Sequence, residues 1–132
     1  MAYAQWVQIR ISSANSNVAI KNAVHEWGKF YSGSKDNEVS PDKIDGVTIH
    51  SGDAYTISAC GRESASSGTE GSFDLYDGNT HIGSYSWNCP WGSKTNYSTW
   101  HPAGSDSYIA QVTGGNLDSG ALGNVDIKIA KF

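Results

Sequence analysis

Hydrophobic and polar residues alternate with a period of two along most of the chain. The alternation is plainest at residues 4–11 and 125–129, where aliphatic side chains occupy every second position. Successive side chains of a strand point to opposite faces of its sheet, so this pattern is typical of a strand with one buried face. Further strands are predicted within 18–31, 47–49, 54–60, 73–76, 81–87, 97–101 and 108–112. Nine or ten short strands without a helix predict an all-β fold, a single-domain antiparallel β-sandwich over residues 1–132.

Turn-forming residues separate these segments. Ser51-Gly52-Asp53 and Asp77-Gly78-Asn79 have the composition of hairpin turns, in which Gly and Asn accept a positive φ. The polar segments 32–46 and 61–71 are predicted to be long loops, and we assign no chemistry to their mixed charges.

A helix is the alternative at residues 20–30, because Ile20, Val24 and Trp27 also follow helical spacing. We favour a strand, since strands flank the segment and since Gly28 and the aromatic residues after it suit a sheet.

Four tryptophans, Trp6, Trp27, Trp91 and Trp100, lie at predicted strand ends or out of phase with the core face. Trp6 either covers a neighbouring surface or is exposed for binding, and the sequence leaves both open. An exposed indole suits a boundary between water and apolar matter, such as a lipid headgroup layer or a sugar-binding groove. We expect at least two of these indoles to gather near Lys94.

The segment Trp87-Asn88-Cys89-Pro90-Trp91-Gly92-Ser93-Lys94-Thr95-Asn96 concentrates such residues. Pro90 lacks a backbone donor, so the segment is a strand end or a loop rather than the middle of a regular element. Lys94 offers a point charge to a phosphate. These residues make the segment a candidate binding loop, and its ligand stays open at this point.

Composition limits the classes of molecule that this chain could bind. Of 132 residues 38% are apolar and only 17% charged, and the net charge is −4. An acidic chain lacks the basic face that nucleic acids require, and it is not attracted to anionic membranes by charge. No apolar run approaches the roughly 20 residues of a spanning helix, and no signal peptide is visible. The sequence predicts a soluble protein, cytoplasmic or secreted without a signal peptide, and any membrane contact should rest on aromatic side chains and on a specific headgroup.

Motifs for catalysis and for metal binding are missing from the sequence. The four histidines form no pair with metal-ligand spacing, and no Gly-x-Ser-x-Gly motif is present. We therefore predict no catalytic residues, no metal and no cofactor. An enzyme acting on lipid or glycan stays open as a minor alternative, because paired carboxylates can come from distant strands.

Two cysteines are too few for a disulfide framework. Two buried free thiols are favoured over a bond between Cys60 and Cys89, which the sequence leaves open.

The chain resembles the aegerolysin family, small β-sandwich proteins of fungi and some bacteria. The resemblance rests on ordered segments that span nearly the whole chain: Ala2-Tyr3-Ala4-Gln5-Trp6-Val7, Ile20-Lys21-Asn22 to Trp27-Gly28-Lys29, Gly71-Ser72-Phe73-Asp74-Leu75, the segment from Trp87 to Asn96, and Gly114-Gly115-Asn116-Leu117-Asp118-Ser119-Gly120-Ala121-Leu122-Gly123.

The resemblance implies a protein that recognises sphingolipid-containing membranes, through sphingomyelin with cholesterol or through ceramide phosphoethanolamine. It implies a haemolysin or cytolysin, or the lipid-recognising component of a two-part pore-forming toxin with a perforin-like partner; the oligomeric state stays open. By position, the implied lipid-contacting residues are Trp6, Trp27, Trp91 and Lys94, with Trp87, Tyr85 and Asp74 as weaker candidates. Within the segment from Trp87 to Asn96 the resemblance narrows the roles: Trp91 and Lys94 are the expected binding pair, and Trp87 and Cys89 are expected to hold the loop to the sandwich. Residues 62–70 differ from the corresponding loop of the mushroom members in being rich in serine. The resemblance therefore does not determine the exact lipid or its dependence on cholesterol. A carbohydrate-binding lectin-like module is the alternative, because exposed aromatic rings also stack on sugars.

Overall fold

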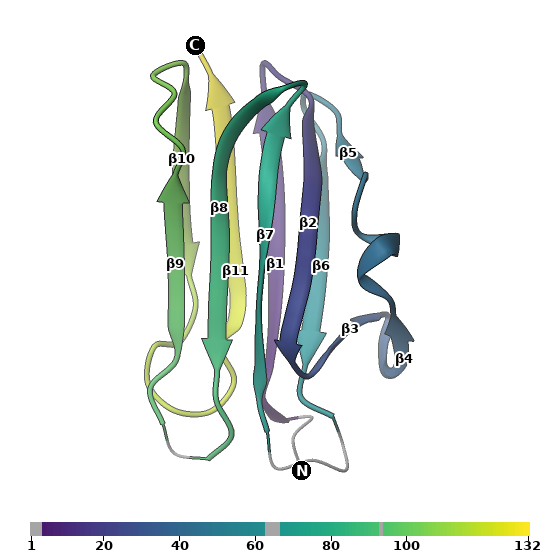
Figure 1. The fold of residues 1–132 in the computed structure, drawn as a ribbon. Coiled ribbons are helices and arrows are strands. Elements are labelled where there is room, and N and C mark those ends of the chain that lie inside the picture. Colours follow the sequence, from purple (N-terminus) through teal and green to yellow (C-terminus); the bar gives the residue numbers. More distant parts are fainter. Residues whose placement is uncertain (1–3, 63–66, 93) are drawn as a thin grey trace.

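The computed structural model describes residues 4–62, 67–92 and 94–132, which form two packed β-sheets and the short 3₁₀ helix η2 (Pro41–Lys43). One sheet, sheet A, has the order β10-β11-β1-β6-β3-β4, and the other, sheet B, has the order β5-β2-β7-β8-β9 (Figure 1). The strands of sheet A are β1 (Trp6–Ala14), β3 (Lys29–Ser32), β4 (Ser34–Val39), β6 (Ala54–Cys60), β10 (Tyr108–Gly114) and β11 (Gly123–Lys131). Those of sheet B are β2 (Val18–Trp27), β5 (Thr48–Ile49), β7 (Thr69–Asp77), β8 (Thr80–Cys89) and β9 (Tyr97–Pro102). The predicted antiparallel β-sandwich is confirmed, and residues 20–27 form a strand rather than a helix.

The aliphatic side chains of sheet A meet in register on its inner face. Ile9 of β1 lies between Ile57 of β6 and Val125 of β11, and all three are buried. Burying one such side chain contributes about 1.5–3 kcal/mol relative to exposure. The alternation seen in the sequence therefore corresponds to one continuous apolar layer.

Aromatic rings dominate the inner face of sheet B. The Phe73 ring centroid lies 5.6 Å from that of Tyr85 and 6.2 Å from that of Trp87, while Phe30 of sheet A meets Trp87 edge-on at 5.9 Å. The indole N–H of Trp87 donates to Thr69 Oγ1 at 3.1 Å, so its polar atom is satisfied inside the core.

One pair of strands departs from the antiparallel pattern. The first strand, β1, and the last strand, β11, run parallel from Val7 opposite Gly123 to Ala14 opposite Ala130. Alternation reports which face of a strand is buried and not the direction of its partner, so the sequence does not reveal this pairing.

The two predicted hairpin turns have different outcomes. The turn at 77–79 is confirmed, because Asp77 of β7 pairs directly with Thr80 of β8. The hairpin at 51–53 is wrong: β5 pairs with β2 in sheet B, whereas β6 pairs with β1 and β3 in sheet A. The same turn residues serve any tight reversal, and here the reversal carries the chain from one sheet to the other.

Segments predicted as loops contain further regular structure. Residues 32–46 include β4 and η2, and β4 lacks apolar alternation because it is a largely exposed edge strand. Of the predicted loop 61–71, residues 69–71 belong to β7, while residues 63–66 lie outside the described residues.

The strand predicted to run from Val18 to Tyr31 is divided between the two sheets at Gly28. Gly28 has φ +85°, and a Cβ there would overlap the carbonyl oxygen of Cys60. Only glycine combines this backbone conformation with this close approach. The crossover ends β2 at Trp27 and so places that indole at one end of the sandwich.

We predict that Gly28→Ala destabilises the protein far more than Gly52→Ala. Gly52 has a similar φ of +90° but open space around it, so alanine there has only a conformational cost of about 1 kcal/mol. At position 28 overlap with the Cys60 carbonyl adds a further loss of roughly 1–3 kcal/mol. Urea unfolding of both variants measures the difference, and equal losses would contradict this account of the crossover.

Candidate functional site

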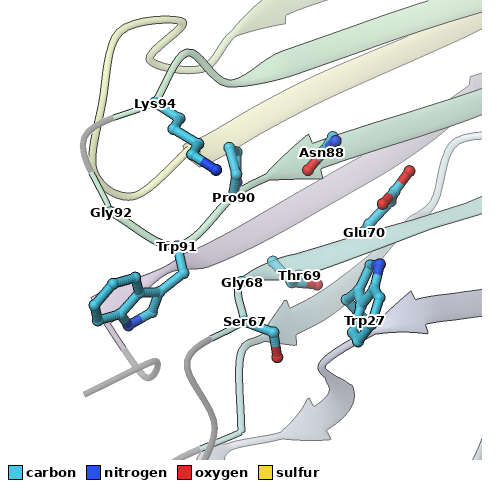
Figure 2. A pocket seen from close by; sticks show the side chains of 10 residues that line it. All are labelled: Trp27, Ser67, Gly68, Thr69, Glu70, Asn88, Pro90, Trp91, Gly92 and Lys94. Atoms are coloured by element: carbon cyan, nitrogen blue, oxygen red, sulfur yellow. The ribbon is translucent and has the colours of Figure 1, made fainter.

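The strands β2 and β8 end at the same end of the sandwich (Figure 1). A pocket of about 590 Å³ opens there (Figure 2). Its walls come from the end of β2, the start of β7, the end of β8 and the loop after β8. The lining residues are Trp27, Ser67, Gly68, Thr69, Glu70, Asn88, Pro90, Trp91, Gly92 and Lys94. Figure 2 shows the Trp27 and Trp91 side chains on either side of the backbone that begins β7.

Strand register aligns the side chains beside this pocket. Trp27 of β2 pairs with Glu70 of β7, Glu70 with Asn88 of β8, and Asn88 with Tyr97 of β9. Glu70 and Asn88 alternate with inward-facing neighbours such as Trp87, and therefore lie on the outer face of sheet B. An indole, a carboxylate, an amide and a phenol thus form one row across four strands.

At Gly68, which lines the pocket, the backbone lies very close to the backbone of Cys89. A Cβ on this residue would overlap the carbonyl oxygen of Cys89, so the chain entering β7 lies directly against the end of β8. Pro90 follows β8 immediately and has no backbone N–H to donate to the sheet. The strand therefore ends here, and the loop that carries Trp91 and Lys94 begins.

Asn96 anchors the far end of that loop. Its side chain is only 2% exposed, and its Nδ2 donates to the carbonyl oxygens of Asn116 at 2.8 Å and Gly120 at 3.0 Å. The Cys89 thiol also donates to Gly120 O, at 3.3 Å. The Trp91–Lys94 loop is therefore held on both sides against the turn between β10 and β11.

The aromatic rings at the pocket remain open to solvent. Trp27 is 59% exposed and Trp91 44% exposed, and Lys94 is exposed as well. The structure thus brings together three of the four residues implied as lipid contacts. It presents two indoles, one ammonium group and the Glu70 carboxylate in a single hollow.

Comparisons with known proteins agree with this architecture. Residues 4–132 match the sequence profile of the family Aegerolysin. The chain belongs to the aegerolysin family. Aegerolysin Aa-Pri1 of Cyclocybe aegerita is 46% identical, covering 98% of this chain and 92% of its own. Asp-hemolysin of Aspergillus fumigatus is 41% identical over 98% of this chain and 95% of its own. The crystal structure of RahU protein in complex with a Tris molecule has a TM-score of 0.94 at 41% identity, covering 99% of this chain and 98% of its own.

Trp6 does not line the pocket of this aegerolysin. The alternation of β1 turns Val7 into the core and Trp6 to the outer face of sheet A, where Trp6 lines a separate hollow with Gln8, Tyr31, Gly33 and Lys35. Lys35 Nζ lies 5.5 Å from the centre of the Trp6 ring. Trp6 lies at the same end of the sandwich as Trp27 but on the opposite sheet (Figure 1).

Tyr85 and Trp87 are buried, which corrects their inclusion among the candidate lipid contacts. The alternation of β8 points both rings into the core. The Tyr85 hydroxyl lies 2.7 Å from Ser98 Oγ, and burial raises the pKa of this phenol to about 12. Both rings therefore pack in the core, away from the surface at which a lipid would bind.

Asp74 lies on the outer face of sheet B but outside the pocket, four residues beyond Glu70 on β7. Its carboxylate accepts hydrogen bonds from Asn22 Nδ2 at 2.8 Å and from Ser84 Oγ at 2.5 Å. These bonds give Asp74 a local structural role.

Trp100, which the sequence placed at a strand end or out of phase with the core face, contributes to the packing of the fold. It is partly buried, packs against the core, and lies where a Cβ on Gly83 would clash with its ring.

Ser84, His81 and Asp74 come together as in a hydrolase triad, but their geometry differs from one. Ser84 donates its proton to Asp74, and the same His81 nitrogen, Nε2, lies 3.2 Å from Ser84 Oγ and 3.9 Å from Asp74 Oδ1. In a triad the imidazole lies between the other two groups and uses a different nitrogen for each. The arrangement of these three side chains is therefore not that of a catalytic triad. Among residues 4–62, 67–92 and 94–132, no three His, Cys, Asp or Glu side chains gather as metal ligands.

Sequence reasoning missed Glu70 and Asn88 as pocket residues. Glu70 fell within the segment predicted as a loop, so its place in a strand was not recognised. Asn88 follows the inward-facing Trp87, and that alternation alone predicts an outward side chain. Both are assigned once the start of β7 at Thr69 is known.

We predict that the two thiols are unreactive in the native protein. Cys60 and Cys89 are free and buried, and burial raises the pKa of each thiol, which lowers its thiolate fraction at neutral pH. A thiol reagent at pH 7 should modify almost no cysteine in native protein and both cysteines after unfolding in urea. Rapid modification of the native protein, or no thiols after unfolding, would contradict the structure.

Proposed function

We propose that this aegerolysin is a non-enzymatic, membrane-lipid-binding protein of the haemolysin type. It recognises a phosphosphingolipid, either sphingomyelin with cholesterol or ceramide phosphoethanolamine, with the pocket at the end of sheet B. The observation that carries this proposal is the presence of Lys94, Glu70 and two exposed indoles in one hollow.

The charges of the pocket complement a zwitterionic headgroup. The Lys94 ammonium binds the lipid phosphate as a point charge. The Glu70 carboxylate and the face of Trp27 or Trp91 attract the choline or ethanolamine cation, which favours an aromatic face. Because the opposite charges of the headgroup each find a partner, an acidic protein binds such a lipid without general attraction to the membrane surface.

The indoles also suit the position of this pocket at a membrane surface. A tryptophan at the interface buries its apolar ring among lipid and keeps its N–H near the headgroups. In the described part of the chain, no helix has the length and apolar character needed to cross a bilayer. The proposed contact is therefore peripheral and rests on side chains at the end of the sandwich.

The resemblance stated above extends this proposal to a two-part toxin. In that arrangement the present chain supplies lipid recognition and a perforin-like protein supplies the pore. Vesicles loaded with a dye separate the two cases, because release by this chain alone would show that it needs no such partner.

A carbohydrate-binding module is the second candidate. A smaller polar groove adjoins the pocket on the outer face of sheet B, where Glu26, Ser72, Ser86 and Tyr97 accompany Glu70 and Asn88. Hydroxyl, amide and carboxylate groups beside an exposed ring also suit a sugar. Binding to glycolipid vesicles that lack phosphate would favour this function over phosphosphingolipid recognition.

We predict selective sedimentation with phosphosphingolipid vesicles. The protein should bind vesicles that contain sphingomyelin with cholesterol, or ceramide phosphoethanolamine, and not vesicles of phosphatidylcholine alone. Phosphatidylcholine has the same phosphocholine headgroup as sphingomyelin, so this selectivity rests on the sphingoid amide and hydroxyl groups, with which the Asn88 side chain of the pocket can form hydrogen bonds. Binding should change little between low and physiological salt, because the net charge of −4 excludes bulk attraction. Equal binding to all three vesicle types, or to none, would refute the proposed function.

Single substitutions test the pocket itself. Lys94→Ala should weaken vesicle binding roughly ten- to a hundredfold, since a hydrogen bond to a charged group contributes about 1.5–3 kcal/mol. Trp91→Ala should also weaken binding, whereas Lys128→Ala, an exposed lysine on β11, should not. Urea unfolding verifies that each variant is folded. A Lys94→Ala protein with unchanged affinity would show that the headgroup binds elsewhere.

A further inference from the structure

A leucine points into solvent at the pocket end of the sandwich. Leu117 lies in the loop between β10 and β11 and is 53% exposed. This loop and the loop that carries Lys94 lie beside each other at that end (Figure 1). The rest of the turn is polar, with Asn116, Asp118 and Ser119, so Leu117 is the one large apolar side chain on its surface.

Internal hydrogen bonds fix the turn that presents Leu117. Asn116 Nδ2 donates to Ser119 O at 2.9 Å, and Asn116 Oδ1 accepts from the backbone N–H of Asp118 at 3.1 Å. The backbone N–H of Asn116 donates to Leu122 O at 2.8 Å, and Leu122 is fully buried beneath the turn. The loop thus buries one leucine and holds the other outside, already in the position in which it would meet a partner.

The same turn is joined to the proposed headgroup pocket. The backbone N–H of Asn96 donates to Leu117 O at 3.3 Å and to Asp118 O at 3.1 Å, and the Asn96 side chain holds Asn116 and Gly120. Asn96 ends the segment that carries Lys94. The two loops are fixed to each other, so they would meet a membrane at this end of the sandwich as one unit.

We propose that Leu117 is a second membrane contact, which inserts among the upper acyl chains beside the bound headgroup. The proposal rests on the proposed function, since it takes the pocket end as the side that faces the bilayer. Indoles remain at the headgroup level, whereas an aliphatic side chain gains most from hydrocarbon. The pocket then supplies lipid selectivity, through the headgroup and the sphingoid groups next to it, and Leu117 adds affinity that depends little on the type of lipid.

The residues next to Leu117 limit how deeply its loop can enter the bilayer. Asp118 is exposed, and transferring its carboxylate into hydrocarbon is costly. The loop therefore enters the bilayer only by the length of the leucine side chain, and contact is confined to the upper part of the acyl chains.

Polar replacement of Leu117 tests the insertion. Leu117→Asn should weaken binding to sphingomyelin–cholesterol or ceramide phosphoethanolamine vesicles about tenfold or more, because the apolar gain of one leucine is lost. The matched control is Ile109→Asn: Ile109 is a similarly exposed residue, 51%, on β10 toward the opposite end of the sandwich. If wild-type protein binds and Leu117→Asn binds equally well, the insertion is refuted while the proposed function stands. If wild-type protein binds none of these vesicles, the proposed function itself fails.

An environment-sensitive fluorophore reports depth directly. Leu117→Cys can be labelled selectively because Cys60 and Cys89 are buried, and Ile109→Cys serves as the control. On vesicles the label at 117 should shift to the blue and be quenched more by a quencher near the headgroup end of the acyl chain than by one near its methyl end. The label at 109 should not change. An unshifted label at 117 on vesicle-bound protein would overturn the proposal.

Discussion

The pairing of β7 with β8 at the end of the sandwich is the constraint on which the site depends. Inside the core, the Trp87 indole donates to Thr69 and so fixes the two strands relative to each other. Since side chains alternate, the next residues, Glu70 and Asn88, must then face outward as neighbours. A shift of register by one residue would bury these polar groups and expose the large indole, and a buried ring of this size makes such a shift costly.

Aromatic residues of this protein fall into two classes with opposite roles. Tyr85 and Trp87 are buried and stabilise the fold, whereas Trp27 and Trp91 remain exposed after folding. Exposed indoles contribute little to the stability of an isolated domain, so their apolar area is available for binding. The fold of this small acidic chain therefore combines a well-packed core with two exposed indoles at one end.

Much of the sandwich was predictable from the sequence, because alternation is a local signal. The strands around Ile9, Phe73 and Ile127 were predicted from it. Residues 87–96 were predicted to be a strand end or loop with a binding role, and Trp91 and Lys94 of this segment line the pocket. Partner choice is not local: the parallel pairing of β1 with β11 and the crossover at residues 51–53 depend on the whole core. Glu70 was missed for that reason, since its orientation follows from pairing with β8 rather than from its own neighbours.

The indole N–H resonances of the five tryptophans give the most direct test of the site. In a two-dimensional ¹H–¹⁵N spectrum of the folded protein, small micelles or bicelles that contain a phosphosphingolipid should shift the signals of Trp27 and Trp91. The Trp87 signal should stay in place, because this indole is buried and hydrogen-bonded to Thr69. Matched particles of phosphatidylcholine alone should move none of them. Lipid-induced shifts confined to other tryptophans, or none at all, would contradict the assignment of the headgroup to this pocket.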